Sequence, residues 1–392
     1  MHHPALTGMP IYLDYNATTP VDPRVLAALW PALTDFGNPS SAHDFGSSAR
    51  RLLAQARDQV ASLIGAASDE IAFTGSGSEA DALAIQGAVL ASAHPVDGAP
   101  HVITQVTEHP AVLAACRHLE KWHGVEVTYL AVDRNGRVDP AEVQAALTAS
   151  TVLVTVMHAN NETGTIQPIA DIAEITRSRG IVLHTDAAQT AGKIGVDVDQ
   201  LGVDLLTVVG HKMYAPKGIA ALYVRDGVPL EPLIGGGGQE RGLRAGTENV
   251  AFAVGLGAAA QLAAEALRAG EAQRLGTLRD QLAAELADRL PGQIHSHGHP
   301  EHRLPNTLNV RIDGSSARDL LAATPGVAAS TGSACHSGQA DPSSGLLALG
   351  LTMEQANTTI RFSLGRWTTS DDVTTAASRI ARTATTVSPV LG

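Results

Sequence analysis

The sequence predicts an α/β protein with a large domain built on a mostly parallel sheet and a smaller α+β domain after it. Helix and strand patterns alternate from about residue 50 to residue 225, the order of consecutive βα units. After four glycines at residues 235–238 the pattern changes to long helices and then short strands. The chain of 392 residues also exceeds what one hydrophobic core usually supports, so we expect two packed domains.

The expected elements follow in chain order. In the large domain, apolar spacing predicts helices over residues 49–64, 79–91, 110–122 and 169–179, and strands over residues 71–73, 101–105, 125–130 and 152–157. After the four glycines it predicts helices over residues 250–267 and 271–290, of which the long Ala-rich one is a plausible connector between the domains, and strands near residues 307–312 and 359–362. Residues 1–8 lack the charged and apolar regions of a signal peptide, and we expect them to form a disordered tail.

The composition limits the partners and the compartment. Lys and Arg number 27 against 39 Asp and Glu, a net charge of −12, which argues against direct binding to nucleic acid or to an anionic membrane. Cys116 and Cys335 are the only cysteines, so a disulfide framework is excluded and a reducing cytoplasm is the expected location. No apolar run approaches the roughly 18 residues of a membrane span, so we expect no membrane association.

Two strand ends carry the side chains that indicate the chemistry. Lys212 follows the apolar run at residues 204–209 through Gly210, and Asp186 ends the run that begins at Ile181. Because the carboxyl ends of parallel strands share one edge of a sheet, both side chains would face one site. A partly buried lysine forms a Schiff base, and an aspartate pairs with a pyridinium nitrogen. Together they predict a pyridoxal phosphate enzyme, although either residue alone is more often a surface lysine or a helix N-cap.

A Gly- and Ser-rich turn between a strand and a helix predicts a phosphate site. Residues 74–80 would direct backbone N–H groups and the helix dipole at an anion, with the Ser78 hydroxyl beside them. The spacing of Gly75 and Gly77 also fits the loose dinucleotide fingerprint. Asp97, about 20 residues on, lies in a predicted loop instead of ending a second strand, which disfavours a nicotinamide enzyme. An ordinary N-cap turn is the other alternative.

Three more polar residues belong to the same edge of the predicted sheet. His109 and Asn161 each follow a predicted strand, where they could stack on a pyridine ring and bond its hydroxyl. Gln189 lies three residues after Asp186, within one helical turn. Each of them alone is typical of a turn, but their convergence on one edge supports a cofactor site.

Ordered motifs from Tyr12 to about Thr369 resemble the pyridoxal-phosphate-dependent cysteine desulfurases, the NifS-like class of the class V aminotransferase superfamily. The motifs that carry the resemblance are residues 12–20, 37–41, 107–109, 160–162, 186–189, 210–212, 241–247, 332–335 and 360–365. The resemblance implies fold type I, with a mostly parallel seven-stranded sheet in the large domain. It also implies an N-terminal segment (1–14) packed with the small domain, a pyridoxal-phosphate-binding domain (15–255) and a small domain (256–392) that carries the cysteine loop.

The resemblance implies a role for each residue around the cofactor ring. Lys212 would bind the cofactor covalently, and Asp186 would pair with the pyridinium nitrogen. His109 would stack on the ring and move protons, while Gln189 and Asn161 would bond the ring oxygen.

The resemblance also implies how the phosphate is held. Gly77, Ser78 and His211 would contact it, and Thr247 would reach it from the other subunit of a homodimer. Val209 stands where the family usually places a serine that bonds the phosphate, a loss worth roughly 1 kcal/mol if nothing replaces it.

Other residues are expected to bind the substrate and to accept its sulfur. The resemblance implies that Asn16, Asn161 and Arg361 bind the substrate, with the Arg361 guanidinium clamping the α-carboxylate. Cys335 lies in a segment of small residues and would be the nucleophile that becomes a persulfide, and His336 is a candidate to assist it. Cys116, by contrast, is expected to be a buried helix residue.

A cluster of histidines is not expected to bind a metal ion. His295, His297, His299 and His302 are spaced by serine, glycine and proline, which indicates an exposed turn.

The implied reaction converts L-cysteine into L-alanine and a persulfide on Cys335, which passes sulfur to an acceptor protein. Relatives supply iron–sulfur cluster assembly, tRNA thiolation or DNA phosphorothioation, and no residue here chooses among them. A class V aminotransferase and a selenocysteine lyase are the enzymatic alternatives. A sulfur carrier without turnover would not need Lys212, Asp186 and His109 together.

Overall fold

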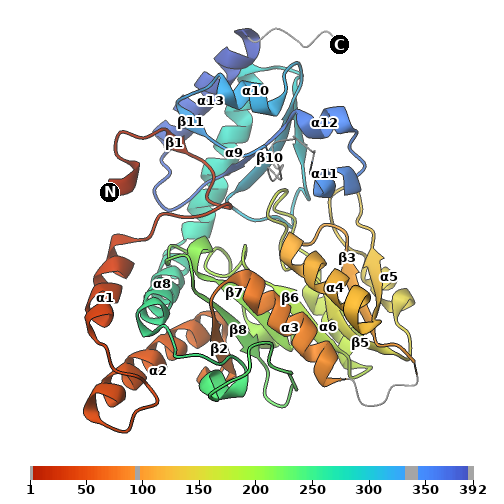
Figure 1. The fold of residues 1–392 in the computed structure, drawn as a ribbon. Helices are drawn as coiled ribbons and strands as arrows, with labels where there is room; N and C mark the ends of the chain where they lie inside the picture. The colour runs from red at the N-terminus through yellow and green to blue at the C-terminus, as the bar shows by residue number, and fades with distance from the viewer. Residues whose placement is uncertain (1–2, 93–97, 332–342, 387–392) are drawn as a thin grey trace.

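Two lobes pack against each other in the computed structural model, which describes residues 3–92, 98–331 and 343–386 (Figure 1). One lobe contains a seven-stranded sheet, and the other contains a three-stranded and a two-stranded sheet. The helix α8 (Val250–Arg268) belongs to the first lobe and leads into α9 (Glu271–Arg289) of the second. The predicted α/β class, with a larger and a smaller unit, is confirmed.

The large sheet has the strand order β2-β8-β7-β6-β5-β3-β4. All neighbours are parallel except those of β8, which is antiparallel to both β2 and β7. The short connection between β7 and β8, residues 210–219, explains this, because a parallel neighbour needs a crossover of a dozen or more residues. The strands are Ile71–Thr74 (β2), His101–Gln105 (β3), Glu126–Leu130 (β4), Thr151–Thr155 (β5), Val182–Asp186 (β6), Leu205–Val209 (β7) and Ala220–Val224 (β8).

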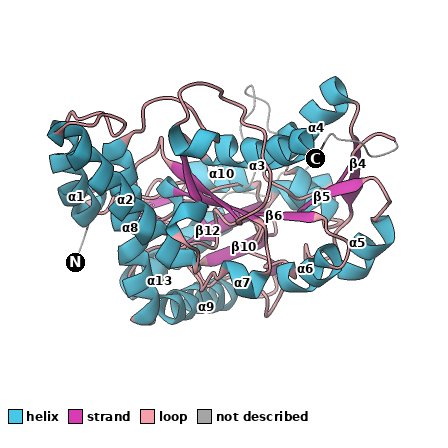
Figure 2. Cartoon of the chain, turned by 90° about the horizontal axis from the view of Figure 1, so that it is seen from below, coloured by secondary structure: helices cyan, strands magenta, loops and turns pink. Residues whose placement is uncertain are grey.

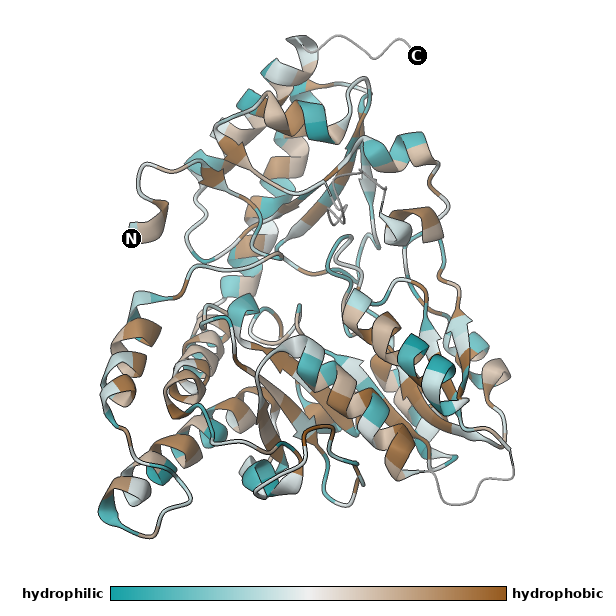
Figure 3. Cartoon of the chain, in the orientation of Figure 1, coloured by the Kyte–Doolittle hydropathy of each residue, from teal (hydrophilic) through white to brown (hydrophobic). Residues whose placement is uncertain are grey.

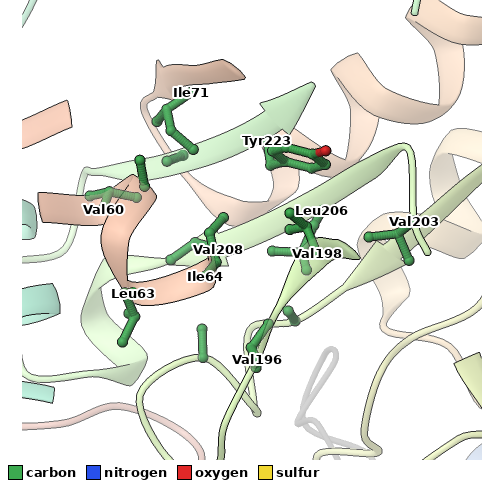
Figure 4. Packing of buried hydrophobic residues seen from close by; sticks show 14 of the residues in the cluster. Val60, Leu63, Ile64, Ile71, Val196, Val198, Val203, Leu206, Val208 and Tyr223 are labelled. Carbon is green, nitrogen blue, oxygen red and sulfur yellow. The ribbon is translucent and has the colours of Figure 1, made fainter. Parts of the chain in front are cut away.

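Helices cover both faces of this sheet (Figure 2). Leu206 and Val208 of β7 join the hydrophobic cluster on one face (Figure 4), and Leu205 joins the cluster on the other. Burial on both faces explains why the strands are almost continuous apolar runs. The first face packs against α2 (Asp44–Ile64), α6 (Ile169–Arg177) and α8, and the second against α3 (Gly77–Ala91) and α4 (Pro110–His123). The remaining helices of this lobe are α1 (Pro23–Thr34), α5 (Pro140–Ala146) and α7 (Val198–Leu201).

The small lobe is built on an antiparallel sheet of order β12-β10-β9. Its core is a separate cluster of buried side chains, to which α9, β10 and β12 contribute. The strands are Ile294–His297 (β9), Thr307–Ile312 (β10) and Thr359–Ser363 (β12), and the helices besides α9 are Ala317–Ala322 (α10), Ser344–Ala348 (α11), Met353–Asn357 (α12) and Ser370–Thr386 (α13).

The N-terminal segment lies on the small lobe. Its strand β1 (Ile11–Tyr12) pairs in parallel with β11 (Val327–Ala328), and Leu13 is part of the small lobe's core. The expectation of a disordered tail is wrong for the described residues 3–8. His3 is buried, its Nε2 lies 2.8 Å from the Val21 carbonyl, and its ring lies 4.5 Å from that of Trp367.

The expectation that no segment could span a membrane needs one correction. By length and composition alone, α8 is apolar enough to do so, and it is apolar along much of its length (Figure 3). Half of that helix is buried, and it packs against α1 and α2. Core helices of globular proteins pass the same test, so the apolar character of α8 is accounted for by packing inside the lobe.

Candidate active site

A cavity of about 550 Å³ lies where the carboxyl ends of β6 and β7 meet the small lobe. Asp186 and Lys212 line it from the large lobe, and Ser330 and Arg361 line it from the small lobe. Pockets at the carboxyl ends of parallel strands are typical of ligand sites in α/β proteins. Of the residues predicted for the cofactor and the substrate, all but Thr247 line this cavity; they are Asn16, Gly77, Ser78, His109, Asn161, Asp186, Gln189, His211, Lys212 and Arg361.

Asp186 ends β6 at the floor of the cavity. Its Oδ1 accepts a hydrogen bond from the Ala188 backbone N–H at 2.8 Å. Burial raises the pKa of Asp186, and the nearby His109 and Lys212 oppose that shift. A positive ring nitrogen placed here would be stabilised by the ionised carboxylate.

Lys212 reaches the cavity from the turn that follows β7. Gly210 is required in that turn, because a Cβ there would lie 2.8 Å from the Ile219 carbonyl oxygen. The Lys212 Nζ donates to the carbonyl oxygens of Asn16 at 2.8 Å and Ala17 at 2.7 Å. Burial, with the charge of Arg361, lowers the pKa of Lys212 to about 8, so about a tenth of the amine is neutral at pH 7, far more than for an ordinary lysine. A neutral amine is the form that attacks an aldehyde.

His109 stands over the same cavity as the N-cap of α4. Its Nδ1 accepts the Ala111 backbone N–H at 3.2 Å, so the ring proton belongs on Nε2. Burial lowers the pKa of His109, which favours the neutral ring. A neutral imidazole can stack on an aromatic ring and exchange a proton at Nε2.

The start of α3 forms the anion end of the cavity. Ser76 caps the helix by accepting the Glu79 N–H at 3.1 Å, and Gly77 and Ser78 follow at the cavity wall. A Cβ on Gly77 would lie 2.5 Å from Val209 Cγ2, so only glycine fits against this valine. Val209, at the position where the resemblance implies a serine, therefore supplies packing against Gly77.

His211 completes the anion end. Its Nδ1 lies 3.0 Å from the Thr18 hydroxyl, which leaves Nε2 for a ligand. Burial and the neighbouring Lys212 lower the pKa of His211 to about 4, so the ring is neutral near pH 7. With a carboxylate at one end, an amine in the middle and a helix N-terminus at the other, the residues fit a pyridine aldehyde that carries a phosphate.

Gln189 and Asn16 form a network beside Lys212. The Gln189 Nε2 donates to the Asn16 carbonyl oxygen at 3.1 Å, and its Oε1 accepts from Lys193 Nζ at 2.5 Å. The Asn16 side-chain Nδ2 donates to the Asn161 carbonyl oxygen and the Thr307 hydroxyl. Its Oδ1 accepts hydrogen bonds from Lys193 and Asn306. The sequence analysis missed Lys193, and the only local signal for it is its position four residues after Gln189.

Arg361 enters the cavity from β12. Its Nη2 lies 2.6 Å from Asp14 Oδ1, and its Nη1 donates to the Asn161 carbonyl at 3.2 Å. The buried Nε has no hydrogen-bond partner in the described part of the chain. The guanidinium is thus held by one carboxylate and one carbonyl, and three of its five N–H groups take part in neither contact.

Acidic side chains that the sequence analysis missed lie beneath Asp186. Asp81, in α3, lines the cavity, and burial raises its pKa well above the usual value, with Asp186 adding to the shift. Glu108 is buried next to the motif residue His109, and burial raises its pKa to about 8. Strand-end reasoning overlooks Asp81 because a helix supplies it.

The other predicted residues lie elsewhere. Thr247 is exposed and does not line the cavity, and Cys335 and His336 lie outside the described residues. Cys116 is buried in α4 as predicted, and burial raises the pKa of its thiol to about 12.

The histidine cluster differs from the predicted turn. His295 and His297 lie on β9, while the rings of His299 and His302 lie 4.7 Å apart in the loop after it. No group of three or more metal-binding side chains occurs within residues 3–92, 98–331 and 343–386.

The fold and this site define a pyridoxal phosphate enzyme of fold type I. The chain belongs to the aminotransferase class V family, which matches residues 11–375. Cysteine desulfurase IscS of Pectobacterium carotovorum subsp. carotovorum (strain PC1) is 48% identical over 371 residues, covering 93% of this chain and 90% of the relative.

Solved structures agree with this assignment. A NifS-like protein has a TM-score of 0.88 at 34% identity, covering 97% of this chain and 100% of the other. A structure of SspA in complex with cysteine has a TM-score of 0.79 at 37% identity, covering 91% of this chain and 99% of the other.

Proposed function

We propose that this chain is a cysteine desulfurase that converts L-cysteine into L-alanine and an enzyme persulfide on Cys335. The observation that carries the proposal is the cavity in which Lys212, Asp186 and His109 converge with Arg361. The names of the relatives support it, since one is a cysteine desulfurase and another was solved with cysteine bound. Pyridoxal phosphate, when bound, supplies an electron sink for the negative charge that develops on the substrate.

The residues of the cavity would bind the cofactor and the substrate and transfer protons. Lys212 would attach the cofactor and then move the α-proton, for which its lowered pKa of about 8 suits it. Asp186 would keep the ring nitrogen protonated, and His109 would exchange a proton at Nε2. Arg361 would bind the substrate carboxylate, while the start of α3 and His211 would hold the phosphate.

Sulfur transfer requires Cys335 to reach the substrate. Its thiolate would attack the substrate sulfur, so that a sulfur–sulfur bond forms as the carbon–sulfur bond breaks. The bonding electrons go to the carbon, which takes up a proton and becomes the methyl group of alanine. Described residues before and after Cys335 in the sequence lie at or next to the cavity, which supports access of Cys335 to the substrate. Ser330 lines the cavity, and the Ser343 hydroxyl donates to Glu162, which also lines it.

A homodimer is part of the proposal. Thr247 is exposed, as a residue that serves a partner's phosphate site would be in an isolated subunit. A nearby region also exposes large apolar side chains, which is typical of an interface; they are Leu26, Trp30, Leu33, Phe36 and Phe45. Light scattering should give twice the mass of the 40.5 kDa chain.

The acceptor is proposed to be another protein in the cytoplasm, without direct contact to nucleic acid. The net charge of −12 disfavours binding to a polyanion. Identifying the protein that receives label from the persulfide would test this part.

The decisive experiment follows sulfur from radiolabelled L-cysteine. The wild-type enzyme should release alanine and retain reducible label on the protein, and Cys335→Ser should lose the label. Cys116→Ser is the matched control, because its buried thiol has no access to substrate, and it should keep the label. Alanine without label in the wild type would contradict the proposal, and 3-mercaptopyruvate with a cofactor amine would indicate an aminotransferase.

A further inference from the structure

Lys193 is a buried lysine to which none of the roles above gives a function. Its side chain comes from the loop after β6 and is largely shielded from solvent. No carboxylate lies within ion-pair distance of it in the described ranges. Burying an amine without a carboxylate is unfavourable for the charged form, and burial accordingly lowers the pKa of Lys193 well below its usual value.

The two hydrogen bonds of Lys193 both go to amide oxygens. Its Nζ donates to Gln189 Oε1 at 2.5 Å and to Asn16 Oδ1 at 3.1 Å. Two N–H groups are enough for both contacts, so they persist whether the amine is neutral or charged.

The bond to Gln189 determines the direction in which that amide points. A glutamine amide has an oxygen at one end and an NH₂ group at the other, with nearly the same shape. Because Lys193 donates in this contact, it holds Oε1, and Nε2 points the other way, towards the Asn16 carbonyl at 3.1 Å. That carbonyl also accepts from Lys212 at 2.8 Å.

We propose that Lys193 is a positioning residue that orients Gln189 so that its Nε2, not its Oε1, faces the ring oxygen of pyridoxal phosphate. The inference rests on the proposed function and adds a residue to it. A reversed amide would place an acceptor against an anionic oxygen, where a charge-assisted hydrogen bond is otherwise available. Lys193 would act on the cofactor only through Gln189.

The first test compares cofactor binding in purified Lys193→Met with that in the wild type and in Lys121→Met. Methionine keeps the length and removes the donors, while Lys121 is an exposed lysine on α4 that serves as the matched control. We expect Lys193→Met to bind pyridoxal phosphate about five- to tenfold more weakly, with a shifted visible absorption maximum. Lys121→Met should match the wild type in both. A wild-type spectrum and affinity in Lys193→Met would overturn the inference.

A double-mutant cycle separates positioning from a general structural role. In a Gln189→Ala background, Lys193→Met should weaken cofactor binding by less than twofold, because the group it orients is gone. If the two substitutions instead weaken cofactor binding by factors that multiply in the double mutant, the inference would be overturned. Thermal unfolding of the cofactor-free proteins accompanies the cycle, since a merely structural lysine would lower the melting temperature without changing the spectrum.

Conservative variants keep the inference testable if Lys193→Met does not fold. Lys193→Arg retains only donors and should stay within about twofold of the wild type, whereas Lys193→Gln can present an oxygen and should lose affinity. The reverse order would overturn the inference. A wild-type enzyme without a visible cofactor band would instead refute the proposed function itself.

Discussion

At the scale of the residue, the environment of Lys212 combines three effects that can be separated. Burial and the charge of Arg361 lower its pKa, while the Asn16 and Ala17 carbonyls hold the amine in place. The sequence predicted Lys212 and Asp186 because each directly follows a buried strand. It did not predict Lys193, whose bond to Asn16 joins positions 177 residues apart. A contact between residues so far apart in the sequence leaves no local sequence pattern.

The lowered pKa of Lys212 predicts how fast the cofactor attaches at each pH. The neutral amine is the reactive form, so the rate of attachment to cofactor-free enzyme should rise with pH and level off above about 8 to 9. An ordinary lysine would continue to gain about tenfold per pH unit up to about 10.4. Growth of the visible absorption band between pH 6.5 and 9.5 measures this. A rate still rising tenfold per unit at pH 9 would contradict the predicted pKa.

At the scale of the element, patterns located the helices and strands better than they located the helix starts. The strand at residues 101–105 was predicted with both its ends. Helix α2, however, begins at Asp44 and not at Ala49, because the His43 side chain accepts the Gly46 N–H at 3.3 Å and caps a turn rich in glycine and serine. Histidine is not a usual cap residue, and such turns do not indicate a helix by composition.

The close contact between the start of α3 and the end of β7 gives a prediction about cofactor binding. In Gly77→Ala the new methyl group would lie 2.5 Å from Val209 Cγ2. The start of α3, which would hold the phosphate, must therefore move away from β7. We expect pyridoxal phosphate to bind at least about tenfold more weakly, measured by fluorescence titration.

Two further variants control this prediction. Adding Val209→Ala to Gly77→Ala should restore most of the affinity, because it removes the obstructing methyl groups. Gly195→Ala introduces the same methyl group where no atom lies within 4 Å and should bind normally. Failure of Val209→Ala to restore binding would show that the contact does not cause the loss.

At the scale of the whole molecule, a few polar contacts join the two lobes around the cavity. Asp22, at the start of α1, accepts from Arg366 of the small lobe at 2.5 Å and from Arg24 at 2.7 Å. Burial alone raises the pKa of Asp22, but the hydrogen bonds from Arg24 and Arg366 outweigh it and hold the pKa far below its usual value. The sequence predicted two domains, but it could not show which side chains connect them.

This ion pair predicts a pH-dependent contribution to stability. A pKa lowered in the folded state stabilises the protein above the unfolded value of about 3.9, and the contribution is lost as pH falls towards the folded value. Asp22→Asn should therefore be less stable than the wild type by about 2 kcal/mol at pH 7, with a smaller difference at pH 3.5. Urea unfolding at both pH values measures this. Asp226→Asn, at an exposed turn, should show no such change, and an equal gap for Asp22→Asn at both pH values would contradict the assignment.

The path of residues 11–17 connects the small lobe with the candidate active site. These residues add a strand to the small lobe and then place two carbonyl oxygens on the Lys212 amine. Deletions that reach this segment are therefore not neutral choices when this enzyme is engineered. Removing residues 11–17 would disturb lobe packing and lysine placement in a single step.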